Sequence, residues 1–256
     1  MPEFKGLIRL ESTMHRTGTA TAMIFRLDPD PYSPFPDAAL AEVEPNGLLA
    51  VGGDLSPIRL INAYRHGIFP WFSADEPIIW WSPDPRTVLF PEKIKISRSL
   101  RKSLRNGQFR VTFDQAFQQV IKACSDPRSG SPGTWLVPEM IRAYTELYQL
   151  GMAHSVEVWQ QGRLVGGLYG VAIGSVFYGE SMFSHVSDSS KVALVHLCRT
   201  LVDMEYKLID CQVYTKHLIS LGAEEIPRKR FCHLLDNWCT LPPPRLKWPS
   251  YGVVTT

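Results

Sequence analysis

Apolar and polar positions follow a clear periodicity in the last two thirds of the chain. Residues 114–124, which begin with Asp114, place four apolar side chains on one helical face, namely Phe117, Val120, Ile121 and Cys124. Ser97 is a favourable N-cap and Pro138 a favourable first-turn residue for two further helices. Besides 114–124, the pattern predicts helices over 97–106, 138–150, about 190–205, 215–222 and 227–238.

Strand-like runs are concentrated between two of these helices. They are AHSVEVW (153–159), RLVGGLYGVAI (163–173) and SVFYGESMF (175–183). The short breaks between them, QQG and Gly174, suit tight antiparallel hairpins. A further apolar run, KLIDCQV (207–213), follows the helix near 190–205. A meander of strands, a crossover helix and one more strand predict an α+β fold.

The chain changes character near residue 90. Before it, the sequence is rich in Pro, Gly and Trp, which predicts turns and short segments around one helix over 57–67. We expect a small N-terminal domain over 24–88 and a larger domain over 89–256. Residues 1–23 lack a long apolar run, so we expect a disordered or tag-like extension there, with Met14 and Met23 as alternative starts.

Composition narrows the classes of protein. Hydrophobic residues make up 45% and charged residues 20%, which is typical of a globular protein. No apolar run approaches the ~18 residues of a membrane-spanning helix. The five cysteines are odd in number and form no CxxC pair, so neither a disulfide framework nor a metal site is expected. The net charge of +2 means that any nucleic-acid site must come from local clustering.

Such a cluster occurs on the helix predicted over 97–106. Four cationic side chains fall on one helical face, while Leu100 and Leu104 lie opposite; the cations are Arg98, Arg101, Lys102 and Arg105. Cations in the first turn of a helix are disfavoured by its dipole, so a compensating gain such as phosphate binding is indicated. The alternative is an ordinary solvated face.

Three polar residues stand inside otherwise apolar strands. Asp210 and Gln212 are two apart on one predicted strand, so their side chains should share a face. A carboxylate among apolar neighbours must be paired or hydrogen-bonded. The structural alternative is that Asp210 caps the following turn. Glu180 is also a candidate, its alternative being a bulge or edge position paired with a nearby arginine.

Several segments resemble the leucyl/phenylalanyl-tRNA–protein transferase family. The most specific are GIFPWFS (67–73), WWSPDPR (80–86) and GESMFS (179–184), and the similarity runs from about Asp37 to about Trp248. The resemblance implies a small N-terminal domain followed by an acetyltransferase-like catalytic domain with a mixed, largely antiparallel sheet.

The same resemblance implies an activity. The family transfers Leu, Phe or Met from aminoacyl-tRNA to proteins whose N-terminal residue is Lys or Arg, which marks them for degradation under the N-end rule. It uses no acetyl-coenzyme A, so no cofactor is expected. A cytoplasmic, monomeric enzyme with aminoacyl-tRNA and acceptor proteins as partners, and without membrane association, is implied.

Residue roles follow only from this resemblance. Asp210 and Gln212 form the catalytic centre, where positioning by Gln212 is more plausible chemically than proton abstraction by a neutral amide. Glu180 orients the donor's α-amino group or terminal adenosine. Trp71 and Trp135 lie near that adenosine, and the basic face of helix 97–106 binds the acceptor stem. The apolar pocket comprises Leu168, Phe177, Met182, Leu194, Leu197, Thr200 and Ile209.

The pocket departs from the family pattern at three positions. Leu168 stands where Met is common, Leu197 where Phe is common and Thr200 where Ser is common, so the preference between Leu and Phe is open. Without the resemblance, the pocket residues are ordinary core. The alternative for Trp71 and Trp135 is a hydrophobic contact between the two domains. For Trp80 and Trp81, such a contact between domains is favoured over a ligand site.

Two other functions are alternatives. A coenzyme A-dependent N-acetyltransferase needs a glycine-rich loop that opens a helix and cradles pyrophosphate, but the candidate run over 161–170 is strand-like. A non-catalytic tRNA-binding module gives no role to Asp210 and Gln212, so alanine at Asp210 should leave its function unchanged.

Overall fold

The computed structural model describes residues 24–126, 136–240, 248 and 254–255 of the 256-residue chain. The extension expected over 1–23 and the candidate Trp135 lie outside these residues. In the part of the chain that is described, no helix has the length and apolar character to cross a bilayer.

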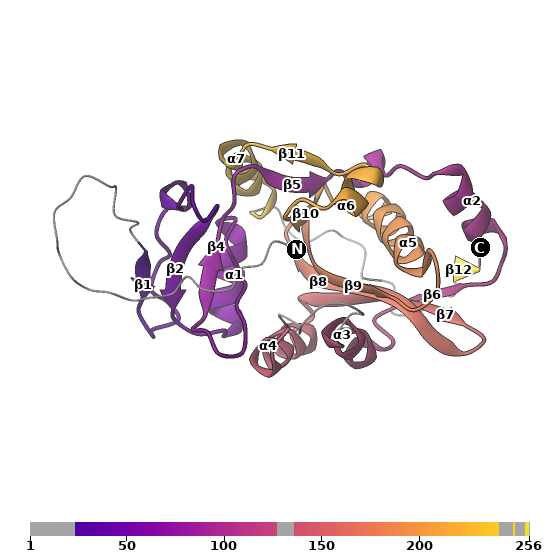
Figure 1. Cartoon of the computed structure of the whole chain (residues 1–256), viewed down its shortest axis with the longest axis horizontal. Coiled ribbons are helices and arrows are strands. Elements are labelled where there is room, and N and C mark those ends of the chain that lie inside the picture. The colour runs from indigo at the N-terminus through magenta and orange to yellow at the C-terminus, as the bar shows by residue number, and fades with distance from the viewer. Residues whose placement is uncertain (1–23, 127–135, 241–247, 249–253, 256) are drawn as a thin grey trace.

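A small four-stranded sheet forms near the N-terminus (Figure 1). Its strands are β1 (Phe25–Leu27), β2 (Leu48–Gly52), β4 (Ile79–Trp81) and β3 (Phe69–Pro70), in that order. The predicted helix over 57–67 is confirmed as α1 (Pro57–Arg65), with Ser56 as its cap. A short 3-10 helix, η1, spans Ala38–Leu40. The four strands were not predicted, because strands of two to five residues show too little alternation.

The second sheet has eight strands in the order β11-β5-β10-β9-β8-β7-β6-β12. The described pairings are antiparallel except for β9–β10, which is parallel. The expected α+β fold with a mixed, largely antiparallel sheet is therefore confirmed. The strands are β5 (Arg86–Leu89), β6 (Arg110–Phe113), β7 (Ala153–Gln160), β8 (Arg163–Ile173), β9 (Val176–Ser184), β10 (Leu208–Gln212), β11 (Glu224–Ile226) and β12 (Val254–Thr255).

Helices cover both faces of the large sheet (Figure 1). One face carries α2 (Arg98–Arg105) and α5 (Ser189–Asp203), and the other carries α3 (Phe117–Ser125) and α4 (Pro138–Gln149). The predicted N-cap of α2 is confirmed, since the Ser97 side chain accepts a hydrogen bond from the Leu100 amide. The remaining helices are η2 (Pro91–Lys93), α6 (Lys216–Ser220) and α7 (Arg228–Trp238).

Two hydrophobic clusters fill the two faces. The first continues from the small sheet and α1 to α3, α4 and α7, and includes Tyr64, Tyr144 and Tyr178. The second lies between the sheet, α2 and α5, and includes Phe177 and Ile209. Because the first cluster joins both sheets, side chains of α1 reach the centre of the large sheet.

The start of α3 differs from the prediction. Asp114 does not begin the helix: it has a left-handed φ of 55°, and α3 starts three residues later at Phe117. The Asp114 carboxylate instead accepts hydrogen bonds from the Ser155 amide and the His154 ring of β7. The buried carboxylate of Glu157 accepts hydrogen bonds from the backbone N–H groups of Gln115 and Ala116, directly before the helix.

Gly170 on β8 allows a close approach of β9. A β-carbon built at this position lies 2.2 Å from the Tyr178 carbonyl oxygen and 2.5 Å from the Phe177 ring. At its cross-strand partner Gly179 the nearest atom is 3.5 Å away. We therefore expect Gly170→Ala to lower the free energy of unfolding by about 1–3 kcal/mol. Urea denaturation measures this, with Gly179→Ala as matched control; equal stability of the two variants would contradict the packing.

Candidate active site

The candidate residues meet where the parallel pairing of β9 and β10 ends. The last paired residues are Tyr178 and Asp210. Glu180 lies two residues further along β9, and Gln212 two residues further along β10. On the other side of β10, the register with β5 shifts between Asp210 and Gln212.

Gln212 has a left-handed backbone with φ of 64°. This conformation is costly for a residue with a side chain, and such strain clusters at functional sites. It also breaks the strand alternation from which a common face with Asp210 was predicted. The two residues are nevertheless in contact, because the backbone N–H of Gln212 donates to Oδ1 of Asp210 at 2.9 Å.

Asp210 forms a fully buried ion pair with Arg86. Nε and Nη2 of the guanidinium donate to the two carboxylate oxygens at 2.8 and 2.7 Å, and both side chains have no exposed surface. The expectation that this carboxylate must be paired is confirmed. Asp210 also accepts a hydrogen bond from the backbone N–H of Gln212, which is the turn-capping contact expected from the structural alternative. One carboxylate therefore both pairs with Arg86 and caps the turn.

Arg86 is held from all sides. Its guanidinium lies 4.7 Å from the centres of the Phe69 and Phe231 rings, and Nη1 donates to the Gly67 carbonyl at 3.1 Å. Aromatic faces and a bidentate carboxylate suit the planar guanidinium better than an ammonium group. The position of Asp210, and through it that of Gln212, is therefore fixed by the junction between the two sheets.

Glu180 is buried among hydroxyl groups rather than paired with an arginine. Tyr64 of α1 donates to Oε1 at 2.7 Å and Tyr144 of α4 to Oε2 at 2.6 Å. Nε2 of Gln212 lies 3.2 Å from Oε1. Burial raises the pKa of Glu180 to about 7, the tyrosine hydrogen bonds oppose the rise, and Asp210 adds to it. This carboxyl group thus changes charge near neutral pH.

The expected pocket side chains form part of the second hydrophobic cluster. Five are buried in it, Met182 packs against it and Thr200 is half-buried; the five are Leu168, Phe177, Leu194, Leu197 and Ile209. Ile209 and Phe177 are direct neighbours across the β10–β9 pair. The set therefore lies on the face of the sheet opposite the Asp210–Arg86 pair, and the two meet only where β9 and β10 part.

Trp71 lies beside the small sheet, half-buried. Its carbonyl accepts a hydrogen bond from the Trp81 indole at 2.7 Å, and the two rings are 6.1 Å apart. Trp80 is completely buried and donates to the Gly52 carbonyl, so it is a core residue of the small sheet. Of the two candidate base-stacking residues, only Trp71 is thus located by the structure.

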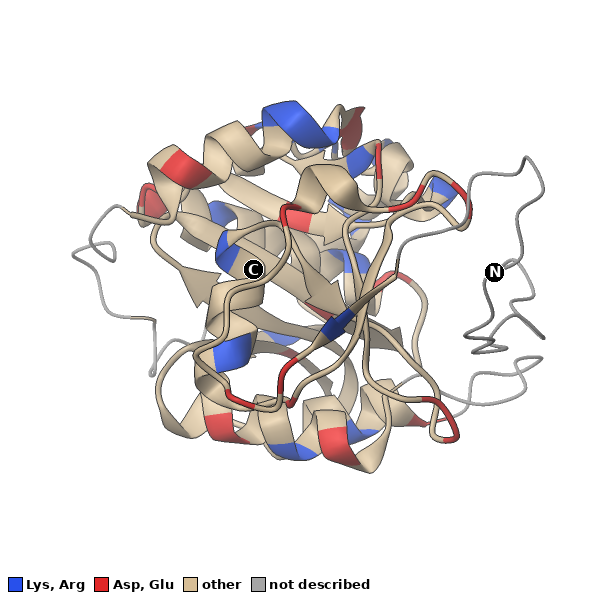
Figure 2. Ribbon diagram, turned by 90° about the vertical axis from the view of Figure 1, so that its left-hand side faces the viewer, with Lys and Arg blue, Asp and Glu red and all other residues tan. Residues whose placement is uncertain are grey.

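The basic face of α2 is confirmed as a solvent-facing surface. Its four cations are exposed while Leu100 and Leu104 are buried, and among the described residues none of the four forms an ion pair. On the side of the molecule seen in Figure 2, by contrast, acidic and basic residues are interspersed. The positive surface of α2 is therefore a local feature of a nearly neutral protein.

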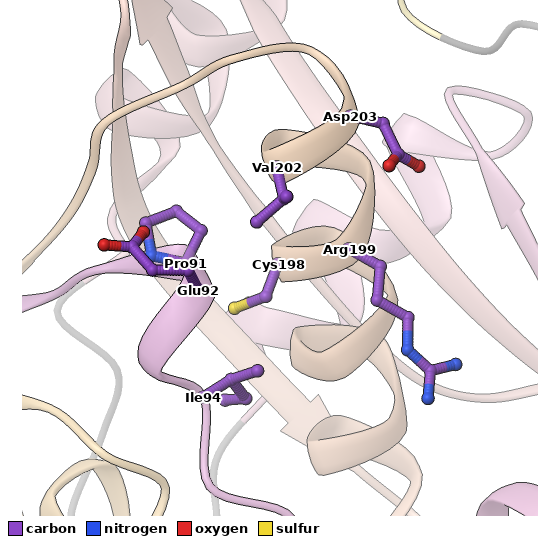
Figure 3. A pocket seen from close by; sticks show the side chains of 7 residues that line it. All are labelled: Pro91, Glu92, Ile94, Cys198, Arg199, Val202 and Asp203. Atoms are coloured by element: carbon purple, nitrogen blue, oxygen red, sulfur yellow. The ribbon is translucent and has the colours of Figure 1, made fainter.

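A surface hollow of about 430 Å³ lies along α5 (Figure 3). It contains none of the expected site residues; its lining is Pro91, Glu92, Ile94, Cys198, Arg199, Val202 and Asp203. Cys198 and Val202 face η2 across the hollow, while Arg199 and Asp203 point to the other flank. The described residues contain no cluster of three His, Cys, Asp or Glu side chains able to hold a metal ion.

The run over 161–170 lies in the β7–β8 turn and on β8, and no helix follows it directly. A pyrophosphate cradle at a helix N-terminus is thus absent from this run. This structural context disfavours the coenzyme A alternative.

Sequence reasoning missed Arg86, Tyr64 and Tyr144. A buried Asp210 calls for a cation, and Arg86 at the end of WWSPDPR was available as a signal. The two tyrosines gave no such signal, because on a helix they follow the same spacing as ordinary core residues.

Comparison with known families identifies the class of protein to which these residues belong. Residues 88–236 match the model of the leucyl/phenylalanyl-tRNA protein transferase, and residues 53–84 match that of its N-terminal domain. The chain belongs to the leucyl/phenylalanyl-tRNA–protein transferase family.

Similar proteins carry the same name. A leucyl/phenylalanyl-tRNA–protein transferase of Nitrosomonas europaea is 58% identical over 84% of this chain and 92% of its own. One from Azotobacter vinelandii is 59% identical over 81% and 92%. The chain is therefore an aminoacyltransferase with aminoacyl-tRNA and protein as substrates.

Among solved structures, a GCN5-related N-acetyltransferase from Kribbella flavida is similar over 63% of this chain and 58% of its own, with 11% identity and a TM-score of 0.33. The L-PGS structure from Bacillus licheniformis is similar over 67% and 57%, with 9% identity and a TM-score of 0.36.

Proposed function

We propose that this enzyme transfers Leu, Phe or Met from aminoacyl-tRNA to the N-terminal Lys or Arg of acceptor proteins and so marks them for N-end-rule degradation. The proposal is supported above all by the placement of Asp210, Gln212 and Glu180 at one point between the two sheets. It places the enzyme in the cytoplasm, where its substrates occur, as a monomer with domains over 24–88 and 89–256.

The reaction is aminolysis of an ester. The donor ester is already activated, so the enzyme must chiefly hold two large reactants in register, which can contribute about 7–11 kcal/mol. The acceptor's α-amino group, with a free pKa of about 7.7–8.0, must also lose a proton. Gln212, held by Asp210, is a positioning group for the attacking amine.

The donor's side chain occupies the apolar set around Phe177 and Ile209 in this proposal. Entry takes place where β9 and β10 part, beside the half-buried Met182. The terminal adenosine stacks on Trp71 and Trp135, and the acceptor stem lies along α2. The α-amino group of the donor comes near Glu180.

A transfer assay tests the proposal. The purified protein is incubated with labelled Leu-tRNA and with two peptides that differ only in an N-terminal Arg or Ala. Label on the Arg peptide alone, lost after ribonuclease treatment, is expected. Modification supported by acetyl-coenzyme A instead would move the protein to the acetyltransferases, and tRNA binding without transfer would favour a non-catalytic module.

The role of α2 predicts a salt-dependent loss of tRNA affinity. Arg101→Ala combined with Arg105→Ala removes two exposed cations, so the slope of log affinity against log salt should fall by about 1.5, at ~0.7–0.9 per phosphate contact. Arg142→Ala with Arg163→Ala, two exposed arginines elsewhere, is the matched control. Filter binding from low to physiological salt measures both slopes, and equal slopes would remove α2 from the interface.

A further inference from the structure

Three oxygen contacts close a ring around Glu180. Tyr64 Oη lies 2.7 Å from Oε1, Tyr144 Oη lies 2.6 Å from Oε2, and the two hydroxyl oxygens lie 2.8 Å from each other. All three side chains are buried, and they come from α1, α4 and β9. All three distances are short enough for hydrogen bonds. A hydrogen bond also requires one hydrogen between the two oxygens of each contact.

Counting hydrogens shows what the ring needs. Each tyrosine hydroxyl supplies one hydrogen, and an ionised carboxylate supplies none. Two hydrogens cannot fill three contacts: if both tyrosines donate to Glu180, two hydroxyl oxygens face each other at 2.8 Å with no hydrogen between them. A proton on Glu180 completes the ring, because each of the three groups then donates once within it.

Among the described residues, no further hydrogen bond reaches the two hydroxyl groups. Gln212 approaches Oε1 and not the hydroxyl pair, and Tyr178 donates to the Tyr64 carbonyl. The Tyr169 hydroxyl is buried without a hydrogen-bond partner. Asp210 and Arg86 act on Glu180 in opposite directions, and burial raises the pKa of Glu180 to about 7.

We propose that the ring formed by Glu180, Tyr64 and Tyr144 is the proton acceptor of the transfer reaction. This inference rests on the proposed function. The acceptor's ammonium gives one proton to the Glu180 carboxylate, which becomes a carboxylic acid and closes the ring. The neutral amine attacks the ester carbonyl carbon, so a C–N bond forms and the bond to the ribose 3′ oxygen breaks. That oxygen takes a second proton from the nitrogen, and Glu180 later releases its own to water.

The acceptor amine and the ring are matched in basicity. A free α-amino group has a pKa of about 7.7–8.0, so proton transfer to a carboxylate with a pKa of about 7 is unfavourable by only about tenfold. Glu180 keeps 9% of its surface exposed and lies next to Gln212, the group that positions the amine. One site therefore both orients the nucleophile and takes its proton.

Glu180→Gln tests the ring without any tRNA. The amide can donate to one tyrosine and accept from the other, so it imitates the protonated acid at every pH. Because the folded pKa of about 7 lies above the usual value of 4.5, wild-type stability is lost as pH rises from about 4.5 to 7. The unfolding equilibrium constant of the wild type, relative to Glu180→Gln, should therefore rise about 200-fold between pH 4 and pH 8. If the ratio of the two unfolding constants did not change with pH, it would contradict the protonation of Glu180 within the ring.

Single-turnover transfer tests the catalytic part. With saturating Leu-tRNA and an Arg peptide, the wild-type rate should rise with pH through about 7. Glu180→Gln should be slower, and its rise should move to the pKa of the acceptor amine, about 7.7–8.0. Tyr144→Phe removes a donor that lowers the pKa of Glu180, so its limb should move to higher pH. Glu157→Gln, at a buried carboxyl group remote from the site, should keep the wild-type limb. An unchanged profile in Glu180→Gln overturns the proton acceptor, whereas no transfer by the wild type overturns the proposed function itself.

Discussion

Asp210→Ala should lower the free energy of unfolding by about 3–5 kcal/mol and reduce transfer at least ~100-fold. The stability loss has one main cause, since the substitution leaves the Arg86 guanidinium buried and without its carboxylate. The activity loss has another, because the backbone N–H of Gln212 loses the carboxylate oxygen that holds this residue in place. Guanidinium chloride denaturation and the Arg-peptide assay measure the two effects separately.

A double variant separates these two causes. Arg86→Met with Asp210→Leu replaces the ion pair by apolar groups of similar size, which is often neutral or stabilising in a protein interior. We expect it to recover most of the stability lost in Asp210→Ala but not the transfer activity. Wild-type transfer by this double variant would show that Asp210 acts only through folding. Equal stability of Asp210→Ala and wild type would contradict the energetic role of the pair.

The long elements of the fold were predictable because each carries its own periodic signal. The strands β7, β8 and β9 and the helices α4 and α5 extend over 8 to 15 residues, enough for alternation or helical spacing to stand out. The strand β6 has four residues and β11 three. Strands this short depend on pairing with neighbouring strands as much as on their own sequence. The start of α3 was wrong because Asp114, a good cap by type, is engaged by β7.

The site was predictable to the level of single residues but not of contacts. A carboxylate in an apolar strand requires a partner, yet Arg86 is 124 residues away from Asp210 along the chain and reaches it through the β5–β10 pairing. Tyr64 is 116 residues from Glu180. Local spacing indicates which face of an element is buried, whereas these pairs depend on which elements the topology brings together.

The residues expected to form the apolar pocket show the same limit of prediction from sequence. Leu168, Phe177 and Leu197 have the spacing and burial of core residues, and in the structure they are core residues. A pocket for a leucyl or phenylalanyl side chain and a hydrophobic core are built from the same side chains. What separates them is the neighbouring polar site at the end of the β9–β10 pairing, which only the three-dimensional arrangement reveals.

Gln212→Gly should abolish most transfer without lowering stability. Gln212 has a φ of 64°, a conformation that costs a residue with a β-carbon about 1–2 kcal/mol and that glycine adopts freely. Glycine also gains freedom in the unfolded chain, which offsets about 0.4–1 kcal/mol. The free energy of unfolding should therefore stay the same or rise by up to ~1.6 kcal/mol.

Transfer by this variant should nevertheless fall about 100-fold or more, since the side chain that positions the amine next to Glu180 is gone. The two results together distinguish a functional from a structural role. If the strained backbone of Gln212 is retained because it positions the side-chain amide, then Gln212→Gly should improve folding and impair transfer. Gln212→Ala, which keeps the β-carbon and the strain, is the matched control and should lose a similar share of transfer with no gain in stability. Full transfer by Gln212→Gly at unchanged stability would mean that the amide positions nothing, and that the left-handed turn only ends β10.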